Sequence, residues 1–253
     1  MRVALQLYSL REDCRKDFFG TLEKVAGMGY EGVEFAGFYG KSAGEVRDKL
    51  RELGLGVAGS HTSFDSLVLW AFDKTVEFNE VLGNKNVIIP SLPGELRGGK
   101  KEWLSFANYL NELSRKLQPH GMRVGYHNHW DEFIPVEGER PWDIIGSNTV
   151  ADVVLQLDVG HAARALGSPE EAIAQLDKYP KRSLTVHVKD FSKQKGYNVI
   201  PGEGDLNWEG FLSACKRNGT EWLIIEQEEY PYPPPVETAK RALNNLREFL
   251  KSI

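Results

Sequence analysis

The chain of 253 residues carries 31 basic and 36 acidic side chains, for a formal net charge of −5, and 41% of its residues are hydrophobic. This is the composition of an ordinary globular protein with a sizeable core, and no basic run predicts a surface that binds nucleic acid. The two cysteines, Cys14 and Cys215, match no metal or redox spacing, which favours a reducing, cytoplasmic compartment. No signal peptide or membrane span is expected. A small molecule is therefore the expected partner, and a homo-oligomer is left open.

Eight short apolar runs alternate with amphipathic stretches. Several are rich in β-branched residues and are flanked by Gly or Asn, which is typical of buried parallel strands. The runs are 3–8, 32–36, 55–60, 86–90, 122–127, 153–158, 183–189 and 221–226. Eight strand–helix units predict an α/β fold, a single (β/α)8 TIM barrel over residues 1–253. The alternative is an open doubly wound sheet, which usually has a glycine-rich loop after its first strand, whereas "SLREDC" follows here.

Several of the predicted helices have recognisable ends. Ser42 and Glu45 have the spacing of a capping box, and Gly54 is a typical C-terminal stop. Ser168 is expected to cap the start of another helix, and residues 207–219 show the same kind of pattern. These signals place helices between the predicted strands.

Polar side chains gather at the carboxyl ends of the predicted strands, where barrels of this kind hold their active sites. They are Gln6, Ser9, Glu34, His61, His127, His129, Asp158, His161, His187, Lys189, Asp190, Glu226 and Glu228. Five of the six histidines belong to this set, and only His120 lies elsewhere. We therefore expect the five histidines to face a common site rather than to pack singly in the core.

The stretch "GYHNHWDEF", residues 125–133, brings two of these histidines together. Residues two apart on a strand point to the same side, so His127 and His129 are expected to face the same cavity. We expect His127 to bind a metal ion and His129 to lie further along, as a substrate or supporting contact. The reverse assignment stays open.

Four of the polar residues have the spacing of successive strands. His127, Asp158, His187 and Glu226 are separated by 31, 29 and 39 residues, and one strand–helix unit takes about 30 residues. Their side chains are therefore expected to converge on the barrel axis. Two imidazoles and two carboxylates suit one divalent cation, with Mn, Co, Mg and Zn all compatible. The alternative is an ion-paired network that fills the barrel mouth without a metal.

Six motifs resemble, in order, those of the sugar phosphate isomerase/epimerase family, whose members are xylose isomerase-like barrels. They are "LQLYSLR", "YHNHWDEF", "LDVGHAA", "VHVKD", "GEGDLNW" and "IIEQE", and the resemblance extends over nearly the whole chain. The family takes Glu, Asp, His and Glu as metal ligands from its fifth to eighth strands. The matching residues are His127, Asp158, His187 and Glu226. His161 matches a family histidine that contacts substrate.

The resemblance implies a divalent-metal-dependent isomerase or epimerase that removes a proton next to a carbonyl of a keto-sugar or keto-polyol. The metal would stabilise the resulting enediolate. One departure matters: His127 stands where the epimerases have a glutamate that acts as one of two opposed bases. This argues against a symmetrical two-glutamate mechanism. It leaves isomerisation, dehydration of an inosose-like polyol, and keto-glycoside lyase chemistry open.

Glu226 is the expected base, because one carboxylate oxygen can bind metal while the other takes a proton. His61, Lys189 and Glu132 are the alternatives. Lys189 could instead bind a substrate oxygen or pair with Asp190. The expected substrate contacts are Gln6, Glu34, His129, His161 and Glu203, with an ion pair as the alternative for Glu34 and a simple turn for Glu203.

Two further classes of function stay open. An endonuclease IV-like phosphodiesterase would need more metal ligands and a basic surface, which the net charge of −5 disfavours. A sugar-binding barrel that has lost its catalytic base is the other. No dedicated phosphate loop is evident, which favours an unphosphorylated sugar or polyol.

Overall fold

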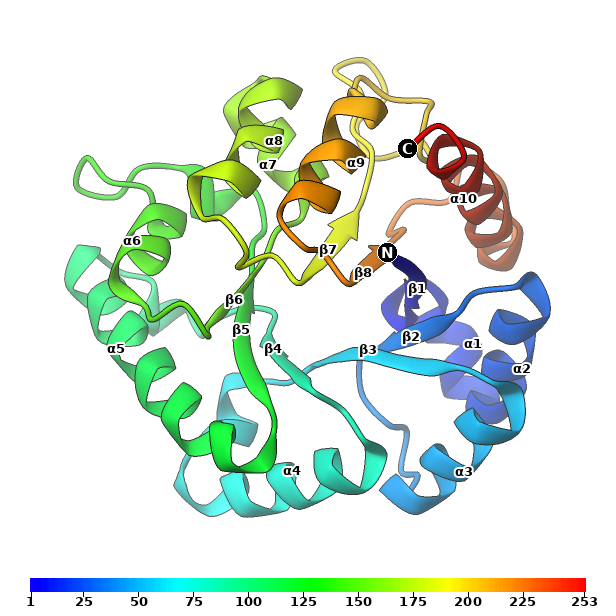
Figure 1. Cartoon of the computed structure of the whole chain (residues 1–253), viewed down its shortest axis with the longest axis horizontal. Helices are drawn as coiled ribbons and strands as arrows, with labels where there is room; N and C mark the ends of the chain where they lie inside the picture. Colours follow the sequence, from blue (N-terminus) through cyan, green and yellow to red (C-terminus); the bar gives the residue numbers. More distant parts are fainter.

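Eight parallel strands follow one another around a central axis, and helices surround them (Figure 1). The structure is a computed structural model that describes residues 1–253. The strands are β1 (Arg2–Gln6), β2 (Gly32–Phe35), β3 (Gly56–His61), β4 (Asn86–Ile89), β5 (Arg123–His127), β6 (Val154–Gln156), β7 (Thr185–Val188) and β8 (Trp222–Ile225). Each of the eight predicted runs therefore overlaps a strand.

The strands form one sheet that curls into a nearly closed barrel. Its order is β6-β5-β4-β3-β2-β1-β8-β7, and every pairing is parallel. The seam between β6 and β7 is closed by a parallel bridge between Asp158 and His187, with the His187 backbone N–H donating to Leu157 O (2.8 Å). The predicted TIM barrel is confirmed, and the open doubly wound sheet is wrong.

Some strands end earlier than predicted because a polar side chain starts a helix there. Asp158 is not part of β6 but caps the following helix. After β1, the Gln6 side chain accepts from the Tyr8 backbone N–H, so the chain turns into a short 3-10 helix at Leu7–Leu10. Both changes turn the backbone just beyond a strand's carboxyl end, where the polar side chains cluster.

The helices have the expected ends and bury one face. They are α1 (Arg11–Lys16), α2 (Phe18–Met28), α3 (Ala43–Leu53), α4 (Leu69–Leu82), α5 (Lys100–Leu117), α6 (Pro141–Asn148), α7 (Val159–Leu166), α8 (Pro169–Lys178), α9 (Trp208–Arg217) and α10 (Pro235–Leu250). The predicted capping box at Ser42 and Glu45 is present, and Ser168 and Asn207 cap α8 and α9. No helix has both the length and the apolar character needed to cross a membrane.

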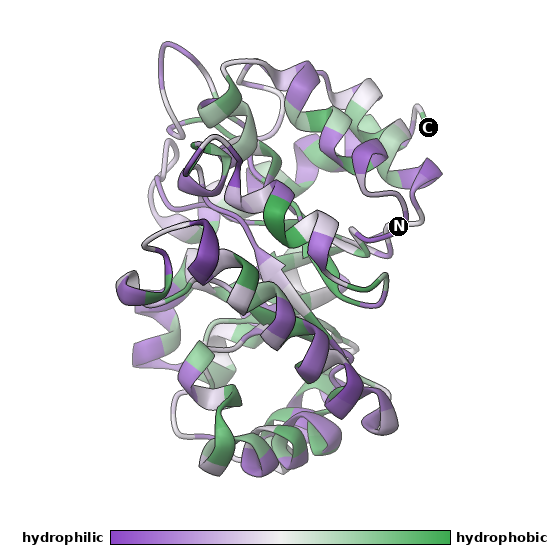
Figure 2. Ribbon diagram, turned by 90° about the vertical axis from the view of Figure 1, so that its left-hand side faces the viewer, coloured by the Kyte–Doolittle hydropathy of each residue, from purple (hydrophilic) through white to green (hydrophobic).

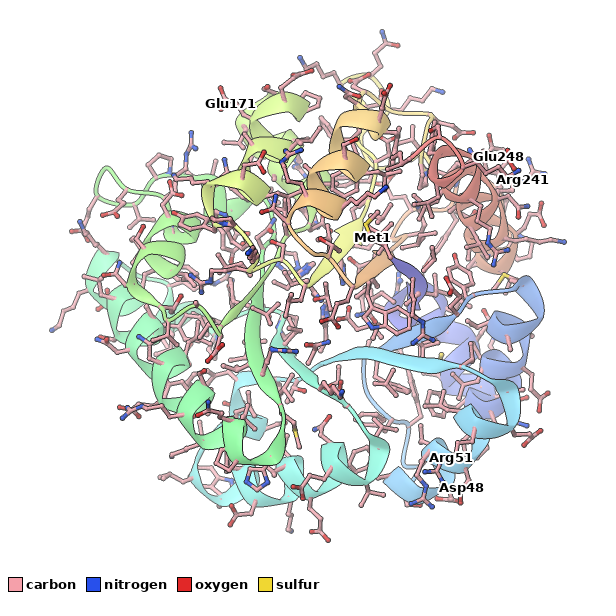
Figure 3. All side chains as sticks on the ribbon, viewed as in Figure 1. Met1, Asp48, Arg51, Glu171, Arg241 and Glu248 are labelled. Atoms are coloured by element: carbon pink, nitrogen blue, oxygen red, sulfur yellow. The ribbon has the colours of Figure 1, made fainter.

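Hydrophilic and hydrophobic residues alternate along the helices (purple and green in Figure 2), as expected for helices with one face on a barrel. Charged residues occupy the outer surface. Figure 3 shows Asp48, Arg51, Glu171, Arg241 and Glu248 at the periphery, and all five are exposed. The main core of 55 buried residues is formed by side chains of the strands and of the surrounding helices.

A second, smaller core lies inside the barrel and consists of Ala4, Ala58, Trp222 and Ile224. Trp222 begins β8, so its indole fills the amino-terminal end of the barrel. Gly32 lies directly opposite, where an added Cβ would come within 2.6 Å of the indole. The amino-terminal end is thus closed by apolar packing, which leaves the polar residues to the carboxyl end.

Replacing Trp222 by Ala should lower the free energy of unfolding by about 3–5 kcal/mol, because a large buried aromatic leaves a cavity that the barrel cannot collapse to fill. Urea denaturation followed by circular dichroism measures this change. The matched control is Trp70→Ala, since Trp70 is 80% exposed whereas Trp222 is 6% exposed, and it should alter stability by less than about 0.5 kcal/mol. Equal losses in the two variants would contradict this account of the barrel interior.

Candidate metal centre

A cavity of about 910 Å³ opens at the carboxyl ends of the strands. Six of its lining residues lie at or just beyond the carboxyl ends of strands: Tyr8, His61, His127, His129, Glu226 and Glu228. Its other walls come from the segments that follow β2, β3 and β4. The cavity thus lies at the end of the barrel where the sequence predicts the site.

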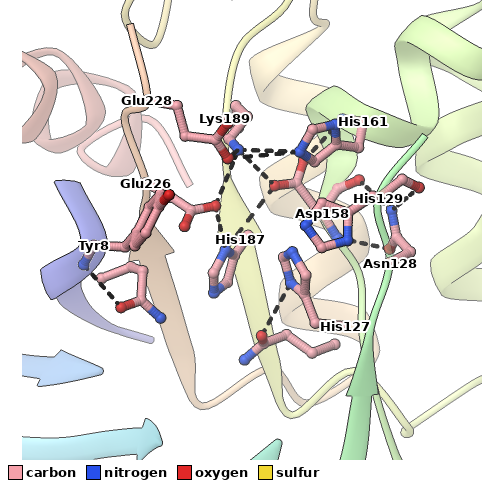
Figure 4. Close-up of polar contacts among 12 residues, drawn as sticks. Tyr8, His127, Asn128, His129, Asp158, His161, His187, Lys189, Glu226 and Glu228 are labelled. Atoms are coloured by element: carbon pink, nitrogen blue, oxygen red, sulfur yellow. Dashed lines mark hydrogen bonds and ion pairs between the residues drawn. The ribbon is translucent and has the colours of Figure 1, made fainter. Parts of the chain in front are cut away.

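Four side chains converge at one edge of this cavity. The ligand atoms of His127, Asp158, His187 and Glu226 all lie within 4.8 Å of one another, and all four residues are buried. Figure 4 shows them directed toward one another from β5, β7, β8 and the end of β6. His127 and Glu226 line the cavity, whereas Asp158 and His187 have no exposed surface. The structure therefore brings together the four residues that the strand spacing predicts.

The Asp158 carboxylate indicates that this group suits a cation. Its Oδ1 accepts from the His161 backbone N–H (2.8 Å) at the start of α7. Its Oδ2 is buried and has no hydrogen-bond partner, with Lys189 Nζ at 3.4 Å and His187 Nδ1 at 4.0 Å. A buried carboxylate oxygen without a partner is unfavourable unless something else satisfies it. Two imidazoles and two carboxylates around it fit a divalent cation.

The His187 imidazole is held by carboxylates on both sides. Its Nε2 lies 2.6 Å from Glu34 Oε2, which can only accept, so Nε2 carries a proton. Its Nδ1 faces Glu226 Oε2 at 3.2 Å. Burial lowers the pKa of His187, but Glu34 and Glu226 outweigh burial and raise the pKa to about 10. Without a cation the ring is therefore protonated on both nitrogens, and a metal bound at Nδ1 must displace that proton.

Gln156 is a site residue that the sequence reasoning missed. Its Oε1 accepts from His127 Nδ1 (3.1 Å) and from His61 Nε2 (2.9 Å), while its Nε2 donates to Glu34 Oε1 (2.7 Å). Because an amide oxygen only accepts, the proton of His127 is on Nδ1 and the lone pair of Nε2 is free for a ligand. The available signal was a polar residue inside the apolar run "VVLQLD".

Gln6 and Glu34 lie beneath the histidines and do not line the cavity. Gln6 Nε2 donates to Glu34 Oε2 (2.7 Å), and His61 Nε2 lies 3.2 Å from the same oxygen. Burial raises the pKa of Glu34, but His61 and His187 outweigh it and lower the pKa. Glu34 thus forms ion pairs with His61 and His187. An ion pair was the alternative to the predicted contact between Glu34 and substrate.

Lys189 is surrounded by carboxylates. Its Nζ lies 2.7 Å from Glu228 Oε1, 3.0 Å from Glu226 Oε2 and 3.4 Å from Asp158 Oδ2. Burial lowers the pKa of Lys189, yet these carboxylates raise it above its ordinary value. The side chain is therefore an ammonium ion, which donates hydrogen bonds and cannot accept a proton.

The suggested pairing of Lys189 with Asp190 is wrong. Asp190 instead accepts from the backbone N–H groups of Gly202 (2.9 Å) and Gly204 (3.0 Å) and from Trp208 Nε1 (3.2 Å). It organises the loop after β7. At Gly204 a Cβ would lie only 2.2 Å from the Asp190 carboxylate, so the loop needs glycine there.

His129 and His161 lie beside the four converging residues. The His129 ring centre is 5.0 Å from that of His127 and 5.1 Å from that of His161. Burial and the neighbouring His161 lower the pKa of His129 to about 4, which keeps its imidazole neutral. His161 lies 3.2 Å from Lys189 Nζ and 2.7 Å from the Tyr197 hydroxyl. As expected, both His127 and His129 line the cavity.

Glu132 and Glu203 do not line the cavity either. Glu132 accepts from the Tyr126 hydroxyl (2.7 Å) and from the His129 backbone N–H (2.7 Å), so it holds the segment after β5 in place. Glu203 accepts from the Tyr232 hydroxyl and joins the loops after β7 and β8. The structure does not bring Glu203 to the four converging residues.

Comparison with known proteins is consistent with this fold. The chain belongs to the xylose isomerase-like TIM barrel family, whose model matches residues 22–249. It is 26% identical to the inosose dehydratase of Clostridium beijerinckii, over 91% of this chain and 89% of that protein. It is 25% identical to the rhizopine catabolism protein MocC of Rhizobium meliloti, over 89% of this chain and 79% of that protein.

Solved structures share the fold at lower sequence identity. A sugar phosphate isomerase/epimerase from Parabacteroides distasonis superposes with a TM-score of 0.79 at 22% identity, covering 100% of this chain and 99% of that chain. The IolI protein, solved with a bound zinc atom, gives a TM-score of 0.73 at 19% identity, covering 100% and 97%. At these identities the likeness establishes the barrel.

Binding of Mn²⁺ should release about one proton near neutral pH, because the pKa of His187 is about 10 in the absence of a cation and its Nδ1 must lose a proton to bind metal. The apparent affinity should therefore rise roughly tenfold for each pH unit between about pH 6 and 9. Calorimetry in buffers of different ionisation enthalpy counts the protons. His120→Gln, at an exposed residue, is the control and should give the same count. Binding without proton release would contradict the prediction.

Gln156→Leu should weaken Mn²⁺ binding by roughly 10–100-fold, the usual cost of removing a group that orients a metal-binding imidazole. The substitution removes the acceptor that fixes the His127 ring. Gln175→Leu makes the same change at a buried position on α8, where the amide bonds only Glu171 O. If both variants bind Mn²⁺ as tightly as the parent chain, Gln156 has no positioning role.

Proposed function

We propose that this protein is a divalent-metal-dependent enzyme that removes a proton next to the carbonyl of a keto-sugar or keto-polyol. The observation that carries the proposal is the convergence of four buried ligand atoms, among them Asp158 Oδ2, which accepts no hydrogen bond although Lys189 Nζ lies 3.4 Å away. His127, Asp158, His187 and Glu226 would hold the cation. When bound, the cation supplies Lewis-acid stabilisation of the negative charge that develops on the carbonyl oxygen.

Glu226 is the proposed base. Burial raises the pKa of its carboxyl group, but Lys189 and His187 lower it well below its ordinary value, so the group is ionised at neutral pH. Lys189 and His187 both approach Oε2 (3.0 and 3.2 Å), while no protein group hydrogen-bonds Oε1. Glu226 lines the cavity, so Oε1 is available to accept a proton from a bound substrate. His61 is the alternative base, since it also lines the cavity.

His129 would contact a substrate hydroxyl, and His161 would support it from behind. The His129 ring lies 5.0 Å from that of His127 and lines the cavity, whereas Lys189 Nζ and the Tyr197 hydroxyl occupy the two nitrogens of His161. The neutral His129 imidazole offers one donor and one acceptor, which suits a hydroxyl group. Buried polar groups that are matched by the correct hydroxyls, and left unpaired by others, give such a site its selectivity.

Dehydration is a second candidate outcome at the same site. The Lys189 ammonium ion lies 3.0 Å from the proposed base, and the surrounding carboxylates keep it protonated. Glu226 would accept the proton from carbon and pass it to the neighbouring hydroxyl, which would leave as water. Relatives described as inosose dehydratases support this outcome. An isomerase or epimerase would instead return the proton to carbon.

Glu226→Gln should retain Mn²⁺ binding in part, because the amide oxygen can still coordinate, while proton removal falls roughly 10²–10⁴-fold. Asp158→Asn should weaken Mn²⁺ binding first, and added Mn²⁺ should restore part of its rate. The measurement is solvent-deuterium exchange into a panel of keto-sugars and inososes, with metal content assayed in parallel and loss of water followed by ultraviolet absorbance.

Glu221→Gln is the control, because Glu221 is exposed and directly precedes the amino-terminal end of β8. It should exchange deuterium at the parent rate. A Glu226→Gln variant that holds Mn²⁺ and also exchanges at the parent rate would exclude Glu226 as the base. The role would then pass to His61.

A further inference from the structure

The cavity extends well beyond the four converging residues. Its volume of about 910 Å³ lies near the top of the range of roughly 300–1,000 Å³ that holds drug-sized ligands. A monosaccharide held at His127 and Glu226 would occupy one end of it. The rest extends over the segments after β2, β3 and β4, and we call it the aromatic arm. Its apolar lining consists of Phe38, Phe64, Phe78, Pro90, Leu92 and Pro93.

The three phenylalanines of the aromatic arm are fixed by packing. The rings of Phe38 and Phe78 lie 4.3 Å apart, and Phe64 packs against Tyr109 at 5.4 Å. All three are half-buried and line the cavity. One part of each ring therefore packs on the protein, while another part is left to contact a ligand. Rigid aromatic rings of this kind bind planar apolar groups.

Several polar side chains of the arm are already paired within the protein. Ser63 Oγ lies 2.8 Å from Ser66 Oγ, and Thr75 Oγ1 donates to Ser66 O (2.6 Å). Asn79 Nδ2 donates to Thr75 O (2.7 Å), and its Oδ1 accepts from Asn84 Nδ2 (2.8 Å). These groups have little hydrogen-bonding capacity left for a ligand.

Thr62 is buried, and its Oγ1 lies 3.0 Å from Ser60 Oγ. Asp65, Lys74 and Ser91 are exposed. Water satisfies them at the open side of the arm. A second sugar ring would find hydrogen-bond partners mainly among these exposed, hydrated side chains, and not along the wall formed by the three phenylalanines. An apolar group needs only the rings and the two prolines.

We infer that the aromatic arm binds an apolar, planar group joined to the sugar, so that the substrate class is a keto-glycoside with an aromatic aglycone. The sugar end of this inference rests on the proposed function. The aromatic arm is defined by its own lining residues, and a binding measurement without turnover tests it.

The test compares the binding of 4-nitrophenyl β-D-glucoside and methyl β-D-glucoside to the Mn²⁺-loaded protein by calorimetry. The aryl glycoside should bind at least roughly tenfold more tightly, because only its ring reaches the arm. Phe78→Ala should remove most of this preference. Phe72→Ala is the matched control, because Phe72 lies on the same helix α4 and is also half-buried but does not line the cavity. It should keep the preference.

Equal affinity for the two glycosides, or no binding of the aryl glycoside at millimolar concentration, would overturn the inference. Phe64→Ala supplies a second variant should Phe78→Ala fail to fold, and circular dichroism reports folding. A full aryl preference in whichever of these variants folds would also overturn it. An aryl preference in a protein that exchanges no deuterium into any keto-sugar would refute the proposed function and leave the aromatic arm standing.

Discussion

A carboxylate with no exposed surface, Glu34, supports the polar end of the barrel. A charge in such a place is unfavourable unless it is paired and hydrogen-bonded. Glu34 accepts from Gln6 and Gln156 and is paired with His61 and His187. Each partner is thereby fixed in orientation, and through Gln156 the constraint reaches the His127 ring. The atoms that face the cavity are therefore positioned by a charge that does not itself line the cavity.

The polar network and the apolar cluster around Trp222 occupy opposite ends of the barrel axis. At one end, the Trp222 indole occupies the space left by Gly32. At the other end, the inward-facing positions carry Gln6, Glu34 and Glu226. Residues two apart on a strand share a face, so Trp222 and Glu226 both point inward from the two ends of the segment around β8. Stability and chemistry thus use different residues of the same strands.

Periodicity and spacing were enough to predict the barrel and to bring His127, Asp158, His187 and Glu226 together, because parallel strands of one barrel share one carboxyl end. They could not predict that Gln156 orients two histidines, since such a role depends on strand register. They also could not separate substrate contacts from buried supports: Glu34 looks the same in sequence whether it faces a cavity or an imidazole. Side-chain partners across the barrel emerge only from three-dimensional packing.

The seam between β6 and β7 links the candidate metal centre to the stability of the barrel. The other seven strand junctions are ladders of paired residues, whereas this one is closed by an isolated bridge between Asp158 and His187. Both residues belong to the group proposed to hold the cation, so a bound ion would fasten the two margins of the sheet directly. A ligand that binds only the folded state stabilises it by mass action. A bound cation would then hold β6 and β7 together, and its removal would destabilise the sheet first at this junction.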